Sequence, residues 1–536
     1  MYTARSTSIL LALFASGLMS AQTTALWGRK QGMYGGTFGV GTDQYSNAYG
    51  AGFIASPGSF DTLVFPCNPV DPFIVKYTAN GNLQWAHAIP PGGGNAYAIA
   101  VDADGNSTVA GEFGGQQICA RYDASGALLW EQGFSAIGSG FMGARGVALD
   151  PAGNIYLTGY YSGHLALDND TIHPVTPSGS QDIFLMKLTD AGQVLWATTA
   201  GGKWGGDDAL GIDVDANGNA AITGRFQDTA YFQTGTIIGN DPMLGGGNSL
   251  FFAKYDPSGS LAWVNGVTSG GPNDAGFSIV YDDAGNLFSA GVCATAQALF
   301  DTLNYQPCCD QDMFLVKFDG DGHGQWIRNS GGVGEFDYDA ARTLAIYNGQ
   351  QVVMAGSVAP IAPTFDGITL APIGDRTMFL AGYDMSGSVL WAKAYEIGSI
   401  NALVPAPDST LVVGGHFGVT VFGAIVHLDT VALDYWNRTG FVAKMSMADL
   451  GLGAPEPGSS GQLQLYPVPA NDRILITLAQ PRAKASPFRI LDLSGRLIAQ
   501  GSLNDAVNVL DVSSLPTATY ILRTDDGVSV RFVVAH

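Results

Sequence analysis

The sequence predicts an all-β fold, and three observations carry this prediction: the composition, the turn-forming residues and an internal repeat. Only five of the 46 acidic residues are Glu, and 73 of the 536 residues are Gly. Asp and Gly favour turns, whereas Glu favours helices. Charged residues make up 13% of the chain and apolar residues 46%. These proportions exclude a disordered chain and a helical bundle.

The start of the chain predicts export. Residues 1–21 have the pattern of a secretory signal peptide, with Arg5, an apolar run over 9–18 and Ala21 before a cleavage site. The apolar run is too short for a membrane span, and no later segment is long and apolar enough for one. The net charge of −22 argues against nucleic acid and anionic membrane surfaces as partners.

Five cysteines in an exported chain permit disulfide bonds but cannot all pair. Cys293 could close a local loop with Cys308 or Cys309, and Cys67 could pair with Cys119. The sequence leaves the pairing open.

Two alternating units repeat along the chain and decide the architecture. The first is an apolar run, a basic residue, a turn with Gly and a Trp four residues after that Gly; it occurs at 72–85, 117–130, 182–196, 250–263, 312–326 and 378–391. The second is a short strand, an Asp/Asn-Gly turn and another strand, as at 101–111, 149–159, 214–224 and 281–291. Four strands per repeat predict the blades of a β-propeller.

The number of blades follows from an imbalance between the strands. A seventh apolar strand with a basic residue, 440–446, lacks its Trp strand, and a lone Trp27 follows the signal peptide. If the strand of Trp27 pairs with the strand of Lys444, the first strand completes the last blade. We therefore predict a propeller of seven repeats over residues 22–450, closed by the N-terminal strand. Eight blades are the main alternative, and six the weaker one.

The repeated residues are expected to have structural roles. The Trp side chains should bury large areas between blades; they are Trp27, Trp85, Trp130, Trp196, Trp263, Trp326 and Trp391. A Lys or Arg occupies the basic position in six of the seven copies, and the sixth copy has Gly382 there. Its expected role is packing with a charge partner.

A different module follows the repeats. Residues 451–461 form a linker rich in Gly, Pro and Ser, and residues 462–536 carry a net charge of about +1. Alternating strands at 474–478, 488–493, 508–515, 519–524 and 528–534 predict a small antiparallel β-sandwich.

Both parts resemble known families. Residues 40–446 resemble the bacterial β-propeller repeats of exported proteins, which implies a fold but no activity. Residues 465–478, 490–501, 510–522 and the last strand resemble the type A C-terminal sorting domain of the type IX secretion system. The motif positions are Pro467, Pro469, Gly495 and Tyr520, whereas Val468 and Ala518 depart from the family pattern. This resemblance implies the secretion machinery as a partner and delivery to the outer cell surface or the medium, by way of the periplasm.

No residue stands out as catalytic, cofactor-binding or metal-binding. Residues 213–218 match the first half of a calcium loop, but its twelfth position is Gly224 instead of Glu. Fragments at 102–105 and 319–322 are similar. We interpret all three as β-turns, with weak Ca²⁺ binding as the alternative. No HExxH or GxSxG motif occurs.

The most favoured function is noncatalytic binding or adhesion, or a scaffold role, with a glycan or a surface protein as ligand. The segments of variable length at 160–181, 225–248, 292–311, 357–376 and 416–438 are the expected recognition loops. Tyr231, Tyr305 and Trp436 lie in them as sugar platforms or packing residues. The alternative is a propeller enzyme, either a quinoprotein-like dehydrogenase or a carbohydrate-active enzyme. An enzyme predicts perturbed carboxylates or histidines at the mouth of the central channel.

Overall fold

A computed structural model describes residues 22–449 and 463–534 apart from short segments inside these ranges. The segments outside the description are 32–33, 56–57, 62, 66–69, 90–92, 114–116, 135, 138–139, 168–170, 176–179, 204, 234, 240–246, 268–272, 295–297, 308–311, 333–338, 360–362, 372–375, 419–423, 429–430, 436–438, 467–472, 479–485, 493–495, 504–506, 514, 517 and 525–528. The predicted signal peptide, the linker, Cys67, Cys308 and Cys309 therefore lie outside the described residues.

All described elements are strands, and they divide between two compact units, Ala21–Leu450 and a unit that contains Gly451–His536. In the first unit, antiparallel pairing groups the described strands of six or more residues into seven sets of four, which we call blades 1 to 7. Blades 1 to 3 are β2 (Gly35–Thr42), β3 (Ala48–Ala55), β6 (Val70–Tyr77) and β7 (Leu83–Ala88); β8 (Gly94–Val101), β9 (Ser107–Phe113), β10 (Gln117–Tyr122) and β11 (Leu128–Phe134); and β13 (Met142–Leu149), β14 (Ile155–Tyr161), β17 (Asp182–Leu188) and β18 (Val194–Gly202).

The remaining blades follow the same order. Blades 4 and 5 are β19 (Asp208–Val214), β20 (Ala220–Phe226), β23 (Ser249–Tyr255) and β24 (Leu261–Val267), then β25 (Ala275–Tyr281), β26 (Leu287–Cys293), β29 (Asp312–Phe318) and β30 (Gly324–Gly331). Blade 6 is β31 (Ala340–Tyr347), β32 (Gln351–Val358), β35 (Thr377–Asp384) and the first half of β36 (Val389–Ala406). Blade 7 is the second half of β36, β37 (Thr410–Phe417), β40 (Thr439–Asp449) and β1 (Gln22–Gln31).

The first strand of each blade, which we call its inner strand, contacts the inner strands of the two neighbouring blades. These contacts run from β2 through β8, β13, β19, β25 and β31 to β36 and from β36 back to β2, so the inner strands form a closed ring. The propeller fold that the sequence predicts is therefore confirmed.

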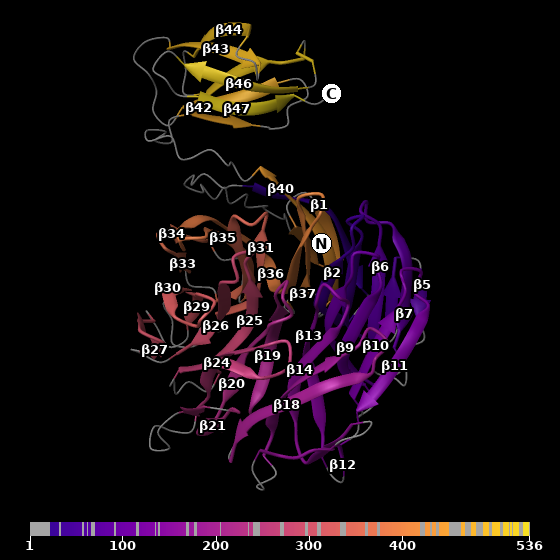
Figure 1. The fold of residues 1–536 in the computed structure, drawn as a ribbon. Helices are drawn as coiled ribbons and strands as arrows, with labels where there is room; N and C mark the ends of the chain where they lie inside the picture. Colours follow the sequence, from indigo (N-terminus) through magenta and orange to yellow (C-terminus); the bar gives the residue numbers. More distant parts are fainter. Residues whose placement is uncertain are drawn as a thin grey trace, which may run out of the picture. The chain divides into compact units, whose positions relative to one another are not determined.

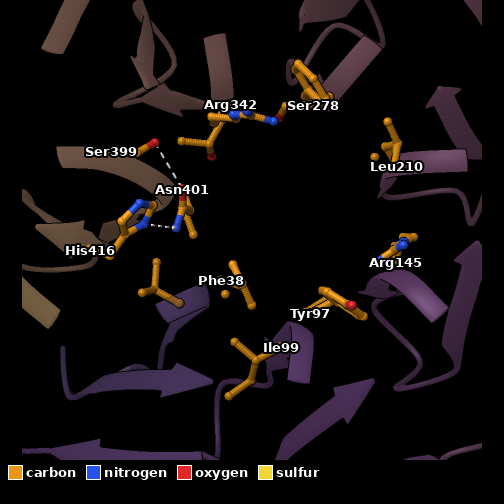
Figure 2. A pocket seen from close by; sticks show the side chains of 18 of the residues that line it. Phe38, Tyr97, Ile99, Arg145, Leu210, Ser278, Arg342, Ser399, Asn401 and His416 are labelled. Atoms are coloured by element: carbon orange, nitrogen blue, oxygen red, sulfur yellow. Dashed lines mark hydrogen bonds between the residues drawn. The ribbon is translucent and has the colours of Figure 1, made fainter. Parts of the chain in front are cut away.

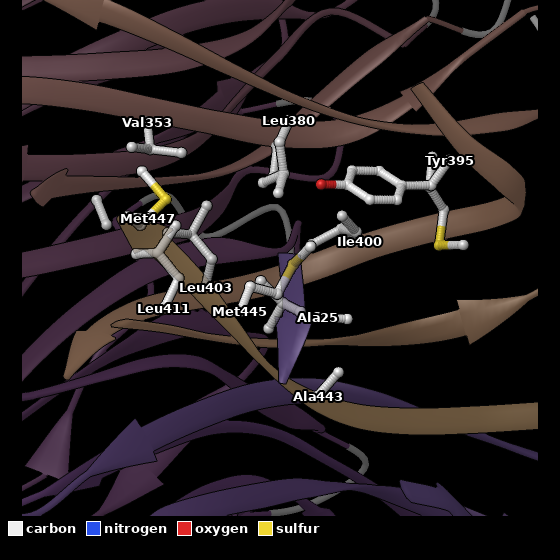
Figure 3. Packing of buried hydrophobic residues seen from close by; sticks show 14 of the residues in the cluster. Ala25, Val353, Leu380, Tyr395, Ile400, Leu403, Leu411, Ala443, Met445 and Met447 are labelled. Atoms are coloured by element: carbon white, nitrogen blue, oxygen red, sulfur yellow. The ribbon is translucent and has the colours of Figure 1, made fainter. Parts of the chain in front are cut away.

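The two ends of the chain meet in blade 7. Strand β1 lies beside β40 (Figure 1) and pairs with it over nearly its whole length. Trp27 lies opposite Lys444, the partner that the strand imbalance predicts for it. Ala25 of β1 packs into a buried cluster with Leu380, Met445 and their neighbours (Figure 3). The first strand thus contributes both backbone pairing and core contacts to the last blade.

Buried side chains gather between blades. Seven apolar clusters in the propeller each combine strands of two consecutive blades, including one cluster between blades 7 and 1. The indole nitrogen of Trp27 donates to the carbonyl of Ala79, 2.9 Å away, in the outer turn of the next blade. Trp85, Trp130, Trp196, Trp263 and Trp326 make the same kind of bond to the next turn.

Trp391 differs because blade 7 has no outer turn to accept its hydrogen bond. Its third and fourth strands, β40 and β1, belong to opposite ends of the chain. The Trp391 nitrogen therefore lies 3.3 Å from Oε1 of Gln351 in its own blade.

The basic residue of the repeat holds the inner turn of its own blade. Arg121 pairs with Asp102 at 2.7 Å and Lys187 with Asp150 at 3.2 Å. Asp102 and Asp150 also accept hydrogen bonds from backbone and Asn side chains of their turns. These carboxylates therefore act on the local turn and its neighbouring strand.

The segments of variable length form short hairpins that connect neighbouring blades. In blade 4, β21 (Thr229–Tyr231) pairs with the outer strand β18 of blade 3. Strand β33 (Thr364–Phe365) of blade 6 similarly pairs with β30, and β4 (Gly58–Phe60) of blade 1 pairs with β1. These segments thus extend the sheet of the preceding blade.

The C-terminal unit is a two-sheet β-structure. One sheet has the order β41 (Leu463–Tyr466), β42 (Arg473–Leu478) and β45 (Val507–Asp511); the other has β44 (Leu497–Leu503), β43 (Ser486–Asp492), β46 (Ala518–Thr524) and β47 (Ser529–Val534). The sequence predicts five of these seven strands. It misses β41 and β44, which lie at sheet edges, and the described residues of β44 are mostly exposed or half-buried, so its apolar pattern is weak.

Candidate binding cavity at the propeller centre

A cavity of about 760 Å³ lies inside the ring of inner strands. Each inner strand has one irregularity in its pairing, a β-bulge that leaves a single residue without a partner opposite it. The bulge of β2 lies between Thr37 and Gly39, and that of β31 between Ala341 and Thr343. The seven bulge residues are Phe38, Tyr97, Arg145, Leu210, Phe277, Arg342 and Asn401.

All seven bulge residues line the cavity and are half-buried in otherwise buried surroundings. Figure 2 shows Phe38, Tyr97, Arg145, Arg342 and Asn401 arranged around a shared opening. The fold therefore presents one side chain from every blade to the same space. Their chemistry differs from blade to blade although their backbone position repeats.

The cavity is lined by the middle of most inner strands, as Phe38–Val40 of β2 and Tyr97–Ile99 of β8 show. Arg376, Ile397 and Gly418, which border strand starts or variable segments, also line the cavity. In blades 6 and 7 the cavity thus also reaches residues of the variable segments.

Arg145 has a carboxylate partner behind the cavity wall. Its Nε lies 3.5 Å from Oδ2 of Asp208, and its guanidinium packs over the rings of Tyr97 and Tyr160 at 4.2 and 5.0 Å. Burial alone would lower the pKa of Arg145, but Asp208 and the two tyrosines outweigh burial and raise it. Glu112 accepts hydrogen bonds from both tyrosine hydroxyls. The positive charge of Arg145 is therefore compensated by Asp208.

Arg342 has a different environment. Its guanidinium lies 4.5 Å from the ring centre of Phe277. The charged group that affects its pKa is Arg376, which carries the same positive charge. Burial, reinforced by Arg376, lowers the pKa of Arg342 to about 10. Among the described residues, Arg342 forms no ion pair with a carboxylate.

Polar groups complete the wall between Arg342 and Phe38. Asn401 donates to the backbone carbonyl of Thr37 at 3.0 Å, and its amide nitrogen lies 3.3 Å from Nδ1 of His416 (Figure 2). Ser399 donates to Oδ1 of Asn401 at 3.0 Å. These bonds fix the amide at the cavity surface.

Three buried aspartates in blades 3 and 4 have raised pKa values. Burial raises the pKa of Asp182 and Asp207 to about 7 and that of Asp208 to about 6, the last against the opposing charges of Arg145 and Arg225. Asp207 accepts hydrogen bonds from the backbone of Gly202 and Gln227. None of the three aspartates lines the cavity, so they do not form the channel-mouth cluster that an enzyme predicts.

The calcium-like fragments form turns. The Asp215 carboxylate accepts from the backbone of Asn217 and Asn219, and Asp319 accepts from Asp321 and His323. In the described part of the chain, no group of three or more His, Cys, Asp or Glu side chains could hold a metal ion.

Among the aromatic residues named for the recognition loops, Tyr231 is exposed. Tyr305 is fully buried and packs against Phe300 in the core of blade 5, so the structure supports packing as its role and not that of a sugar platform. Trp436 lies outside the described residues, as do Pro467, Pro469 and Gly495 of the sorting motif. Tyr520 is buried, and its hydroxyl donates to the carbonyl of Pro516 at 2.8 Å.

Sequence reasoning missed the seven bulge residues. Their signal is positional: in blades 1 to 5 the bulge residue lies five positions before the first Asp of the inner turn, as Phe38 does before Asp43 and Phe277 before Asp282. Residue type gives no signal, because aromatic, basic, apolar and amide side chains all occur there.

In the part of the chain that the structure describes, no helix is long and apolar enough to cross a membrane.

The chain is similar, at low sequence identity, to a curated protein and to solved structures. An uncharacterized WD repeat-containing protein of Acanthamoeba polyphaga mimivirus is 23% identical over an alignment of 367 positions, which covers 54% of this chain and only 26% of that protein. Among solved structures, the Dos1 propeller has a TM-score of 0.39 at 11% identity, covering 80% of this chain and 96% of that one. PorZ, a surface component of the type IX secretion system of Porphyromonas gingivalis, has a TM-score of 0.23 at 10% identity, covering 94% and 75%.

Residues 464–534 match the family described as the secretion system C-terminal sorting domain. This part of the chain contains the predicted sorting strands and Tyr520. The chain therefore combines a β-propeller with a type IX secretion system C-terminal sorting domain, which directs it to the cell surface or beyond.

Proposed function

We propose that this chain is a noncatalytic binding protein that the type IX secretion system delivers by way of the periplasm, and that it binds its ligand in the central cavity. The observation that carries the proposal is the convergence of seven bulge side chains on one cavity of about 760 Å³. Small-molecule sites usually have volumes of this order and combine apolar walls with a few fixed polar groups.

The polar groups of the cavity favour binding over catalysis. Ser278 and Thr343 each accept a hydrogen bond from a backbone amide of the next inner strand, so their hydroxyls support neighbouring strands. Among the described lining residues there is no Asp, Glu, Lys or Cys. His416, whose imidazole could act as a general base, lies with its Nδ1 3.3 Å from the amide nitrogen of Asn401. Directional donors such as the guanidinium groups of the lining arginines suit recognition.

The proposal is tested by binding of the purified full-length chain to arrays of glycans and cell-surface polysaccharides. Hits are measured by titration calorimetry, and the ligand is examined by mass spectrometry after prolonged incubation. The cavity variant is Leu210→Trp, which places an indole at a bulge position that faces the cavity. The matched control is Tyr231→Ala, which removes an exposed aromatic ring from a variable segment outside the cavity lining.

We expect Leu210→Trp to abolish binding, Tyr231→Ala to keep it, and the ligand to be recovered unchanged. Loss of binding in Tyr231→Ala alone would place recognition on the variable segments and overturn the cavity assignment. Recovery of a converted product would support the enzyme alternative.

A further inference from the structure

The charge of the cavity is opposite to that of the chain. Acidic residues outnumber Lys and Arg by 46 to 24. Even so, Arg145, Arg342 and Arg376 line the cavity, and its described lining residues include no Asp or Glu. Positive side chains gathered in a concave surface raise the local concentration of anions.

The three arginines are not equivalent. Arg145 is compensated by Asp208 and is held over two tyrosine rings, as described above. Arg342 packs 4.5 Å from the ring centre of Phe277 and forms no ion pair with a carboxylate among the described residues. Arg376 also lines the cavity and carries the same charge. A half-buried guanidinium that has no carboxylate partner raises the free energy of the empty site, and a bound anion lowers it.

Guanidinium groups suit oxyanions in particular. Their planar arrangement of N–H donors matches the oxygens of carboxylate, sulfate and phosphate groups. The rest of the wall offers aromatic surface from Phe38, Tyr97 and Phe277 and hydrogen-bonding groups from Asn401 and His416. Such a wall can contact the uncharged ring of a sugar through its faces and its hydroxyl groups.

We propose that the central cavity binds a small saccharide that carries an oxyanion, with Arg342 and Arg376 holding the charged group and the opposite wall contacting the sugar ring. This inference rests on the proposed function and specifies its ligand class. Carboxylate and sulfate substituents share the required chemistry, and the experiment separates them.

The test uses calorimetric titration of the full-length chain at low salt with D-galacturonate, galactose 6-sulfate and neutral D-galactose, and with acetate and sulfate ions as fragments. We expect at least one anionic sugar to bind about tenfold or more tightly than galactose, with an affinity that falls as NaCl is added. The preferred anion identifies the substituent.

The decisive variant is Arg342→Gln, which removes the charge and keeps most of the length of the side chain. It should weaken the anionic sugar about tenfold to hundredfold and leave galactose unchanged, and Arg342→Lys should restore part of the affinity. The matched control is Arg496→Gln, which removes the same charge from an exposed position in the sorting domain and should change nothing. Far-ultraviolet circular dichroism and thermal unfolding establish that each variant is folded.

Equal affinity for galactose and the anionic sugars, or equal effects of Arg342→Gln and Arg496→Gln, would overturn the inference. So would a failure of all anionic probes to bind. The proposed function can be distinguished from this inference. A neutral ligand that binds wild type but not Leu210→Trp would support binding in the cavity and refute the oxyanion class.

Discussion

Trp27→Ala probes the closure of the propeller, because this side chain joins the noncovalent strand β1 to blade 1. Trp27 is 7% exposed, its ring packs 5.7 Å from that of Tyr77, and Gly81 lies directly against it. Truncation of a buried Trp costs about 3–5 kcal/mol. The carbonyl of Ala79 loses the indole donor but keeps the Lys444 ammonium at 3.5 Å, so we expect no further large desolvation cost.

For a unit of ~430 residues, a loss of 3–5 kcal/mol corresponds to a fall in Tm of about 3–6 °C. Thermal unfolding followed by calorimetry measures this shift, and limited proteolysis with mass spectrometry locates cleavage in residues 22–31. The matched variant is Trp196→Ala, in which a half-buried Trp makes the corresponding bond to Pro257 within a continuous strand pair. We expect a smaller shift and no cleavage near the N-terminus for Trp196→Ala. Equal shifts without N-terminal cleavage would refute the view that Trp27 holds the closing strand in place.

Three further predictions concern the fold and its titrating groups. Gly259 and Gly285 have φ values of +84° and +81°, but of these two only Gly259 has a Trp ring 2.8 Å from an added Cβ. Gly259→Ala should therefore destabilise the protein by at least about 1 kcal/mol more than Gly285→Ala in denaturant titrations. Equal losses of stability would contradict the contact with the Trp ring. Burial raises the pKa of Asp182 to about 7, above its unfolded value of about 4, so this group destabilises the fold increasingly as pH rises from about 4 to 7. Asp182→Asn should therefore be more stable than wild type at about pH 8. A stability gain of Asp182→Asn that grows on acidification would refute this sign. Burial also raises the pKa of the Cys119 thiol to about 12, so alkylation of this free cysteine should require unfolding of the protein. Peptide mass spectrometry maps the alkylated site, and rapid labelling of Cys119 in the native protein would contradict this prediction.

The propeller could be predicted from the sequence because its repeat is fixed by contacts that demand particular residues. Each outer turn needs Gly for its positive φ and for the Trp ring of the preceding blade, as Gly387 shows beside Trp326. The inner turns of blades 1 to 5 each have an Asp that accepts their backbone amides. Residues under such constraints recur in most copies and make the repeat visible.

The cavity could not be predicted in the same way, because a bulge constrains the backbone and leaves the side chain open. Leu210, Arg342 and Asn401 occupy equivalent positions with unrelated chemistry. Recognition by the variable segments stays a prediction, and some of these segments form hairpins that join neighbouring blades, as β21 does with β18. The edge strand β44 was missed because it buries little of its surface.

The pairing of Trp27 with Lys444 also dictates an order of events during folding. The strand that is synthesised first cannot find its partner until nearly the whole propeller has been made, and blade 7 stays one strand short during that interval. Such a distant contact forms slowly because a very long segment of chain must be brought together before it contributes stability. Closure is then the final step of folding, and until it occurs the edge of β40 remains available for pairing with other strands. We therefore expect propellers in which β1 has been deleted to associate through this edge.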